Sequence, residues 1–430
     1  VKNIPNHNDD GSLASSVNQR EATAIVVAGT ATNPIIYASS SDVRIGGPSG
    51  DKNLDTNSGI ITRISWNGSS WTAVDLVRGL PRSEENHASH GMELITINGT
   101  NYLLLAQGGH TNAGSPSTNF AWVCEYALSG AILAIDLDQL DALPVLTDAS
   151  SGRQYVYDLP TLDDPTRANA NGIADPNAPG YNGIDINDPF GGNDGLNQAK
   201  VVINGPVQIF SSGYRNCYDI VVTESGAVIA TDNGANGGWG GYPENEGMSG
   251  TVTNRYRPGE PGSTSADNGE AKVDNKDHLT LITSDIQNYS FGSFYGGHPN
   301  PVRANPNGAG LFTRGSHSAD PGDSNGNGFT DDWFRDQILP TTDPNFGTQS
   351  LPVDWPPVPS AMADIREGDY RLPSGTNPDA ANDANITILQ NNSNAIDEYT
   401  ANTFGGAMKG SLIIGRNGGG NLHRITLNPD

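Results

Sequence analysis

The sequence has little cysteine, no long apolar run and few basic residues. Its two cysteines, Cys124 and Cys217, could form one disulfide in an oxidising compartment, or each could be a small buried thiol in an apolar run. No run approaches the ~18 apolar residues that a membrane helix needs, so we expect no membrane insertion. The first residues are polar rather than basic and then apolar. We therefore expect a soluble chain that is already processed or is excised from a longer one.

The shortage of basic residues gives the chain a strongly acidic balance. There are 23 Lys and Arg against 48 Asp and Glu, for a formal net charge of −25. Such a surface repels nucleic-acid phosphates and anionic lipids, so nucleic acid is not an expected partner. Clusters of Asp, Asn and Gly recur along the chain. We expect bound calcium, which is plentiful outside cells, to neutralise part of this charge.

The composition predicts a loop-rich β protein, with 53 Gly, 28 Pro and 17% charged residues. Short apolar runs between turn signals are typical of strands, and four in succession match one propeller blade. The first group of runs is 24–28, 35–39, 60–66 and 71–76, and the second is 92–97, 102–106, 121–126 and 131–137. Asn98-Gly99 is a strong hairpin signal within the second group.

Long irregular stretches interrupt the blade pattern at about 147–199, 243–277 and 296–402. Loops of that length are usually functional or held in place by other contacts. Five blade-like units can be counted, and a propeller must close its ring. We therefore expect an all-β, six-bladed propeller that forms one domain over residues 1–430. The sixth blade would come from weak strands in the insertions, from the termini, or from sequence outside this chain.

The stretch 213–241 has the layout of a site. Two apolar runs flank a polar turn that ends at Gly226, which predicts a hairpin. These runs are 218–222 and 227–230. Arg215 and Asn216 precede the first strand, and a loop rich in oxygen donors and glycine follows the second. A hairpin ends beside the point where it starts. We therefore expect the cation Arg215, the amide Asn216 and a loop suited to binding a metal ion to lie close together.

A second ion-binding candidate is the segment 323–332. Oxygen-bearing side chains alternate along it, a glycine follows for the sharp turn, and two carboxylates end it, which reproduces most of a calcium loop. The candidate ligands are Asp323, Asn325, Asn327, Phe329, Asp331 and Asp332. The usual final glutamate is absent, and an unoccupied turn is the alternative. A vaguer candidate, Asp185, Asn187 and Asp188, could equally be a solvated acidic loop.

The central hairpin resembles the glucose/sorbosone dehydrogenase family. The shared order is Arg-Asn, strand, glycine turn, strand, acidic residue and a Gly-x-Asn loop. Members of that family are soluble β-propellers that use pyrroloquinoline quinone (PQQ) and calcium, so the resemblance implies this fold and these cofactors. It implies that Arg215 and Asn216 contact the quinone. It also implies that Asp232 and the backbone carbonyls of Gly234 and Ala235 surround the calcium.

The resemblance further implies a general base and additional cations. In the family a histidine at a blade entrance takes the substrate hydroxyl proton, and by position this is His90. The alternative is a histidine hydrogen-bonded to a loop carbonyl. The quinone carries three carboxylates, so its pocket needs several cations. Besides Arg215, the candidates are Arg303, Lys409 and Arg416.

Two functions from different classes follow. The first is an extracellular, calcium-dependent quinoprotein that oxidises an aldose or sugar alcohol by hydride transfer to the quinone. The second is a non-catalytic glycan-binding or adhesive module, because segments around Asp188, His298 and Lys409 resemble sugar-dehydrogenase-like domains of large bacterial surface proteins. The family has an Arg-x-Arg pair in its last blade, and here the only match is Arg255-Tyr-Arg257, well before that blade. This difference favours the non-catalytic module. Both imply an extracellular or bacterial cell-surface location.

Overall fold

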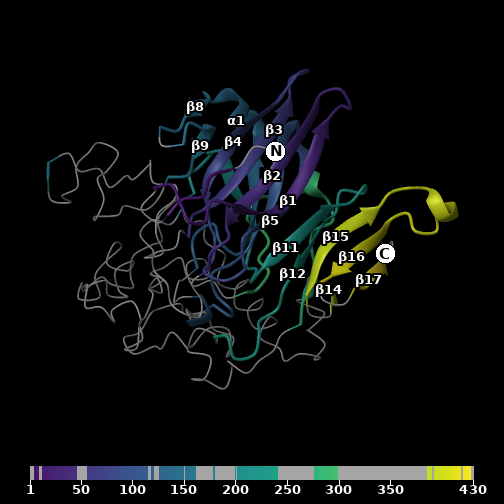
Figure 1. The fold of residues 1–430 in the computed structure, drawn as a ribbon. Coiled ribbons are helices and arrows are strands. Elements are labelled where there is room, and N and C mark those ends of the chain that lie inside the picture. Colours follow the sequence, from purple (N-terminus) through teal and green to yellow (C-terminus); the bar gives the residue numbers. More distant parts are fainter. Residues whose placement is uncertain are drawn as a thin grey trace.

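A computed structural model shows a mostly β protein (Figure 1). It describes residues 4–8, 12–45, 56–114, 118–120, 125–149, 151–160, 178–179, 199, 201–240, 276–298, 385–389, 392–417 and 420–427. Helix in these residues is limited to α1 (Leu137–Ala142) and the short 3₁₀ turns η1 (Thr118–Phe120), η3 (Ile286–Asn288) and η4 (Thr403–Gly406). No helix in this part of the chain is long and apolar enough to cross a membrane.

The first sheet has the strand order β1-β2-β3-β4-β9-β8. Its strands are β1 (Arg20–Gly29), β2 (Pro34–Asp42), β3 (Gly59–Trp66), β4 (Trp71–Leu80), β8 (Leu146–Thr147) and β9 (Gln154–Asp158). The four strands predicted for the first blade are confirmed. β9 pairs parallel to β4 although it lies in an expected insertion. Ion pairs of Arg78 with Asp158 and of Arg153 with Asp75 hold it there, and such contacts leave no apolar pattern.

The second sheet has the order β10-β7-β6-β5. Its strands are β5 (Ser89–Ile97), β6 (Thr100–Gln107), β7 (Ala131–Asp136) and β10 (Val207–Ser212). The predicted hairpin is confirmed, with positive φ at Asn98 and Gly99. The prediction of a strand at 121–126 is wrong for its last two residues, because Glu125 and Tyr126 are not in a strand. Residues 121–124 lie outside the described ranges, and β10 supplies the fourth strand.

The third and fourth sheets have the orders β11-β12-β13-β14 and β15-β16-β17. Their strands are β11 (Cys217–Val222), β12 (Val228–Asp232), β13 (His278–Thr283), β14 (Asn385–Ile388), β15 (Ser393–Tyr399), β16 (Ser411–Arg416) and β17 (Leu422–Thr426). The central hairpin is confirmed as β11 and β12, and Gly226 in its turn has a positive φ. β14 and β15 lie in the range 296–402, which we expected to be irregular.

The hydrophobic core is divided into layers between successive sheets. On β6, Leu103 and Leu105 pack toward the first sheet, while Leu104 and Ala106 pack toward the third. A further layer joins the third sheet to the fourth through Ile229 and other residues. Because strand side chains alternate between faces, a strand covered on both faces needs a continuous apolar run, which explains the sequence of β6.

The first strands of the four sheets lie side by side. β1 contacts β5, β5 contacts β11, and β11 contacts β15. These four strands border one shared groove, which β16 and β17 of the fourth sheet also line (Figure 1). Stacked sheets with their first strands inward are typical of propeller blades. The described residues form four sheets that do not close a ring, so six-bladed closure stays a prediction.

Candidate functional site

His90 lies at the start of β5, in contact with the central hairpin. Its imidazole stacks on the ring of Tyr218, with centroids 4.6 Å apart and planes 19° apart. Its Nε2 lies 2.9 Å from the Oδ1 of Asn216. The residue is 2% exposed. The two neighbours belong to β11 and its entrance, so the packing of the second sheet on the third brings His90 and Asn216 together.

The two ring nitrogens of His90 are not equivalent. Donation from Nε2–H to Asn216 Oδ1 leaves the lone pair on Nδ1, whereas acceptance from the backbone N–H of Ala88, 3.0 Å away, requires the other tautomer. Nδ1 is buried and has no hydrogen-bond partner among the described residues. Burial, followed by the charge of Arg82, lowers the pKa of His90 to about 3. The imidazole is therefore neutral at physiological pH.

Arg215 is buried beside these residues with part of its guanidinium unused. Its Nε donates to Asn112 Oδ1 at 3.0 Å, and its Cζ lies 6.0 Å from the ring centroid of Phe120. Its Nη2 has no hydrogen-bond partner among the described residues, although the residue is only 3% exposed. A buried cation with an unused donor is costly, because desolvation is not repaid. An anionic ligand group would satisfy it.

Asp232, at the end of β12, holds the entrance of β11. Its two carboxylate oxygens accept the backbone N–H groups of Asn216 at 2.8 Å and Arg215 at 3.3 Å. Burial raises the pKa of Asp232 to about 7, even though these two hydrogen bonds and the charge of Arg215 lower it. The carboxylate therefore fixes the backbone of the Arg-Asn pair, and its role as a calcium ligand stays a prediction.

The glycine loop after β12 is tied to the start of β13 by Asp277. Asp277 accepts the backbone N–H of Gly234 at 3.2 Å and that of Ser393 at 2.7 Å, together with the side-chain amide of Asn233. Within the described residues no hydrogen bond is donated to the carbonyl oxygens of Gly234 or Ala235, the two atoms that the resemblance assigns to calcium. In this part of the chain no group of three or more His, Cys, Asp or Glu residues is placed to hold a metal.

Two consecutive glycines allow the β6 loop to approach the hairpin entrance. A Cβ on Gly108 would lie 2.7 Å from Asn216 Oδ1, and one on Gly109 would lie 2.7 Å from the carbonyl oxygen of Arg215. The N–H of Gly109 donates to that same carbonyl at 2.8 Å. Real Cβ contacts are not so short, so larger residues would push the two loops apart.

Glu125 and His298 form a second buried pair near Arg215, which the sequence did not reveal. Nε2 of His298 lies 3.2 Å from Oε1 of Glu125, and both side chains are 1% exposed. Glu125 also accepts the backbone N–H groups of His110 and Thr111. Burial opposes ionisation of Glu125, but His298, the charge of His110 and the hydroxyl of Ser129 lower its pKa to about 2. The pair therefore fastens the loop after β6 to the loop after β13.

Arg82 holds the backbone of the segment that leads into β5 and His90. Its guanidinium donates to the carbonyl oxygens of Asp42 at 3.0 Å and Ser83 at 2.7 Å, and it also reaches those of Glu85 and His87. His87 Nδ1–H in turn donates to the carbonyl of Gly109 at 2.8 Å. No local sequence signal marks Arg82, because its partners are backbone carbonyls.

The remaining predicted site residues are not all near this cluster. Arg416 ends β16 opposite Ser393, at the same end of the sheets as Asp277. Lys409 instead lies 3.4 Å from Glu224, a residue of the turn between β11 and β12. This turn is at the opposite end of the hairpin from Arg215 and Asn216, roughly 20 Å away along the six residues of β11. Arg303 and the calcium candidates at 185–188 and 323–332 lie outside the described residues. Cys124 does too, and Cys217 is a buried free thiol.

Comparison with models of known protein families finds no match, and comparison with curated proteins also finds none.

Proposed function

We propose that the protein is a quinoprotein sugar dehydrogenase built on a six-bladed β-propeller. The observation that carries the proposal is the contact of His90 with Asn216, whose neighbour in the chain is Arg215, because the resemblance to the glucose/sorbosone dehydrogenase family assigns these three residues to one site. The inward first strands of four stacked sheets support the propeller. The unused Nη2 of Arg215 supports an anionic ligand in this place.

Each residue has a role that follows from its contacts. Arg215 would pair with a carboxylate of the quinone, and Asn216 would hold His90 through the hydrogen bond to Nε2. Nδ1 of His90 would accept the hydroxyl proton of an aldose or sugar alcohol. The quinone, when bound with its activating calcium, supplies the hydride acceptor. The carbonyls of Gly234 and Ala235 would hold that calcium, and Arg416 is the nearest additional described cation among the candidates.

A second candidate function is a non-catalytic, glycan-binding or adhesive module of a larger surface protein. The observation that favours it is the near-complete burial of His90 and Arg215, which are 2% and 3% exposed. In that case Arg215 is a strut between loops, and its contact with Asn112 serves the fold alone. Calcium would again stabilise the loops.

Quinone binding separates the two functions. PQQ would be titrated into the purified chain with calcium, and the quinone absorbance would be followed. Saturable binding that is lost in Arg215→Ala but kept in Arg63→Ala, a partly exposed arginine paired with Asp141, is the expected result. Absence of saturable binding by a correctly folded chain would overturn the enzyme and leave the adhesive module.

A further inference from the structure

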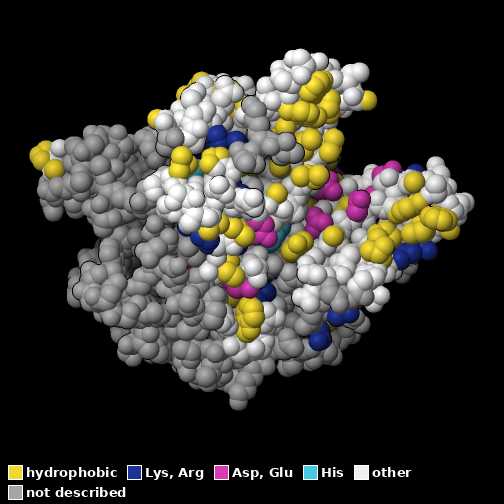
Figure 2. Space-filling model, in the orientation of Figure 1, with side chains coloured by type: hydrophobic (Ala, Val, Ile, Leu, Met, Phe, Trp, Pro, Cys, Tyr) yellow, Lys and Arg dark blue, Asp and Glu magenta, His cyan; other side chains and the backbone are white. Residues whose placement is uncertain are grey.

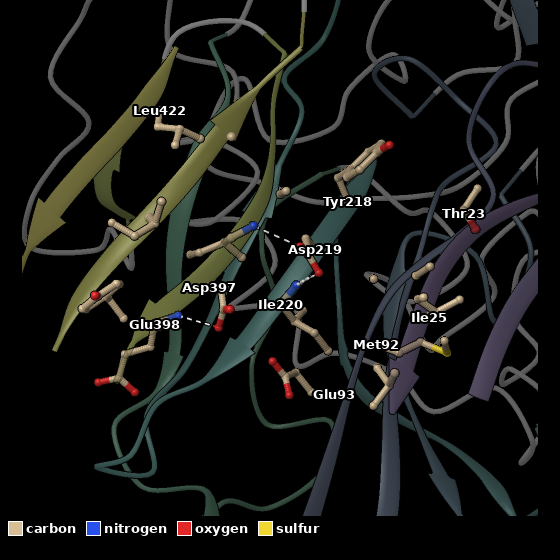
Figure 3. A pocket seen from close by; sticks show the side chains of 18 residues that line it. Thr23, Ile25, Met92, Glu93, Tyr218, Asp219, Ile220, Asp397, Glu398 and Leu422 are labelled. Atoms are coloured by element: carbon tan, nitrogen blue, oxygen red, sulfur yellow. Dashed lines mark hydrogen bonds between the residues drawn. The ribbon is translucent and has the colours of Figure 1, made fainter. Parts of the chain in front are cut away.

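A groove of about 830 Å³ lies among the first strands of the four sheets. Its walls come from β1, β5, β11 and β15, with β16 and β17 at one side (Figure 3). Figure 3 shows Met92 and Ile25 on one side and Asp397 and Glu398 on the other, with Asp219 and Glu93 between them. The groove is separate from the Arg215 cluster, and Tyr218 lies between the groove and His90.

Every charged residue that lines the groove is acidic. The four carboxylates are Glu93, Asp219, Asp397 and Glu398, and the described residues of the lining include no Lys, Arg or His. Asp219 is satisfied by the backbone N–H groups of Ile220 and Ile396, each at 3.0 Å. Glu93 receives no hydrogen bond from the described residues. The groove therefore gathers acidic side chains, and no described residue of its lining supplies a counter-charge.

Large apolar side chains stand exposed beside these carboxylates. Ile25 and Val27 on β1 are each 66% exposed, and Leu422 on β17 is 75% exposed. Figure 2 shows hydrophobic side chains on both lobes that border a hollow in which Asp and Glu gather. Exposed apolar surface of this kind is found at sites that bind proteins, ligands or membranes.

We propose that this groove binds an extended, basic segment of a partner protein, with alternating cationic and aliphatic side chains. Cationic side chains would meet Glu93 and Asp397, and aliphatic ones would cover Ile25 and Leu422. Ile25 and Val27 are two residues apart on one strand face, roughly 7 Å, which matches the spacing of alternate side chains in an extended peptide.

Two other occupants of the groove fit less well, a second copy of the chain and a small polycation. A second copy also carries a formal net charge of −25, so two copies repel at an acidic groove. A small polycation would neutralise the carboxylates but would leave Ile25, Val27 and Leu422 uncovered. Burial and the neighbouring charges of Asp219 and Asp397 raise the pKa of Glu93 to about 7, so a cationic partner would relieve a real electrostatic cost.

The test uses a capped, labelled eight-residue peptide of alternating Lys and Val, titrated into the full chain with fluorescence anisotropy as the readout. We expect saturable binding that weakens as salt rises. Glu93→Gln should weaken it about fivefold or more, and so should Ile25→Ser, whose site is exposed and does not affect the core. Asp141→Asn removes an equal charge from a half-exposed carboxylate that pairs with Arg63 outside the groove lining, and it should leave affinity unchanged.

Three results would overturn the proposal. One is a peptide affinity no higher than that of the matched Glu-Val peptide. Another is an equal loss in Asp141→Asn and Glu93→Gln, which would show general attraction to an acidic chain. The third is competition by spermine at equal strength together with no effect of Ile25→Ser, which would make the groove a small-cation site.

Discussion

Nε2 of His90 and Oδ1 of Asn216 lie 2.9 Å apart, although 126 residues separate them in the chain. His90 starts the first strand of the second sheet, and Asn216 precedes the first strand of the third. The contact forms only when β5 and β11 pack against each other. The geometry of the candidate site is therefore linked to the packing of whole sheets, and its loss should follow any change that separates them.

His90→Ala tests the general base. If the quinoprotein proposal is right, the chain reconstituted with PQQ and calcium should reduce a dye with some aldose. The substitution should lower the rate by ~10²-fold or more, the usual contribution of a positioned base. Quinone affinity should change little, because His90 pairs with Asn216 rather than with a cofactor carboxylate. Equal rates in the variant and the parent chain would remove His90 from the chemistry.

Arg215→Lys separates the enzyme from the adhesive module. A lysine keeps the charge but cannot form a bidentate pair with a carboxylate, so quinone affinity should fall if Arg215 binds the cofactor. If Arg215 is a strut, the substitution should lower the free energy of unfolding by about 1 to 3 kcal/mol through a poorly satisfied buried group. Melting temperature and quinone affinity, measured on this one variant, give the answer. A stability loss with no quinone affinity in the parent chain refutes the enzyme.

Gly91→Ala tests how the second, third and fourth sheets are joined. A Cβ on Gly91 of β5 would overlap the carboxylate of Asp219 on β11, which also accepts the N–H of Ile396 on β15. Asp219 would have to move, so we expect a loss of about 1 to 3 kcal/mol in the free energy of unfolding. Urea denaturation measures it. Gly415→Ala is the control, because its Cβ would only touch Ala395 at 3.5 Å.

Much of the β framework was predictable because it depends on local signals. Asn98-Gly99 and Gly226 adopt the positive φ angles that their hairpins require. Continuous apolar runs such as that of β6 become strands buried on both faces. The fourth sheet was only half predicted, since β15 buries Ile396 but is otherwise mostly polar, and its pairing partner β16 lies after a further loop.

The candidate site was predictable in part for a related reason. The apolar runs predict the strands that flank Arg215, Asn216 and His90. The proximity of these three residues could therefore be expected once the hairpin was predicted. Glu125 and Asp277 could not be found this way. Their carboxylates are satisfied by backbone N–H groups from distant loops, and such contacts have no fixed spacing in the sequence.

Calcium removal tests the predicted loop at 323–332, which lies outside the described residues. A ligand that binds only the folded state stabilises it in proportion to the logarithm of its concentration over Kd. Excess chelator should therefore lower the melting temperature, and added calcium should restore it. Asp323→Ala should reduce the difference between the two conditions. Identical melting curves with chelator and with calcium would contradict the prediction.

The pH dependence of stability tests the electrostatics of the groove through Glu93. Burial, with the charges of Asp219 and Asp397, raises the pKa of Glu93 from 4.5 to about 7. Between these two pH values the folded chain keeps a proton that the unfolded chain has lost. The stability that this proton confers is complete below about pH 4.5 and is lost as pH rises to about 7.

Glu93→Gln should remove this part of the pH dependence, because the amide does not titrate. The variant should match the parent chain at pH 4 and exceed it at pH 8 by about 1 to 2 kcal/mol in the free energy of unfolding, after an allowance for solvent screening. Some slope should persist, since burial also raises the pKa of Asp219, to about 6. Urea denaturation at pH 4, 6 and 8 measures the change. Glu224→Gln, an exposed control, should keep the parental slope, and an unchanged slope in Glu93→Gln would show that Glu93 has the same pKa in the folded and the unfolded chain.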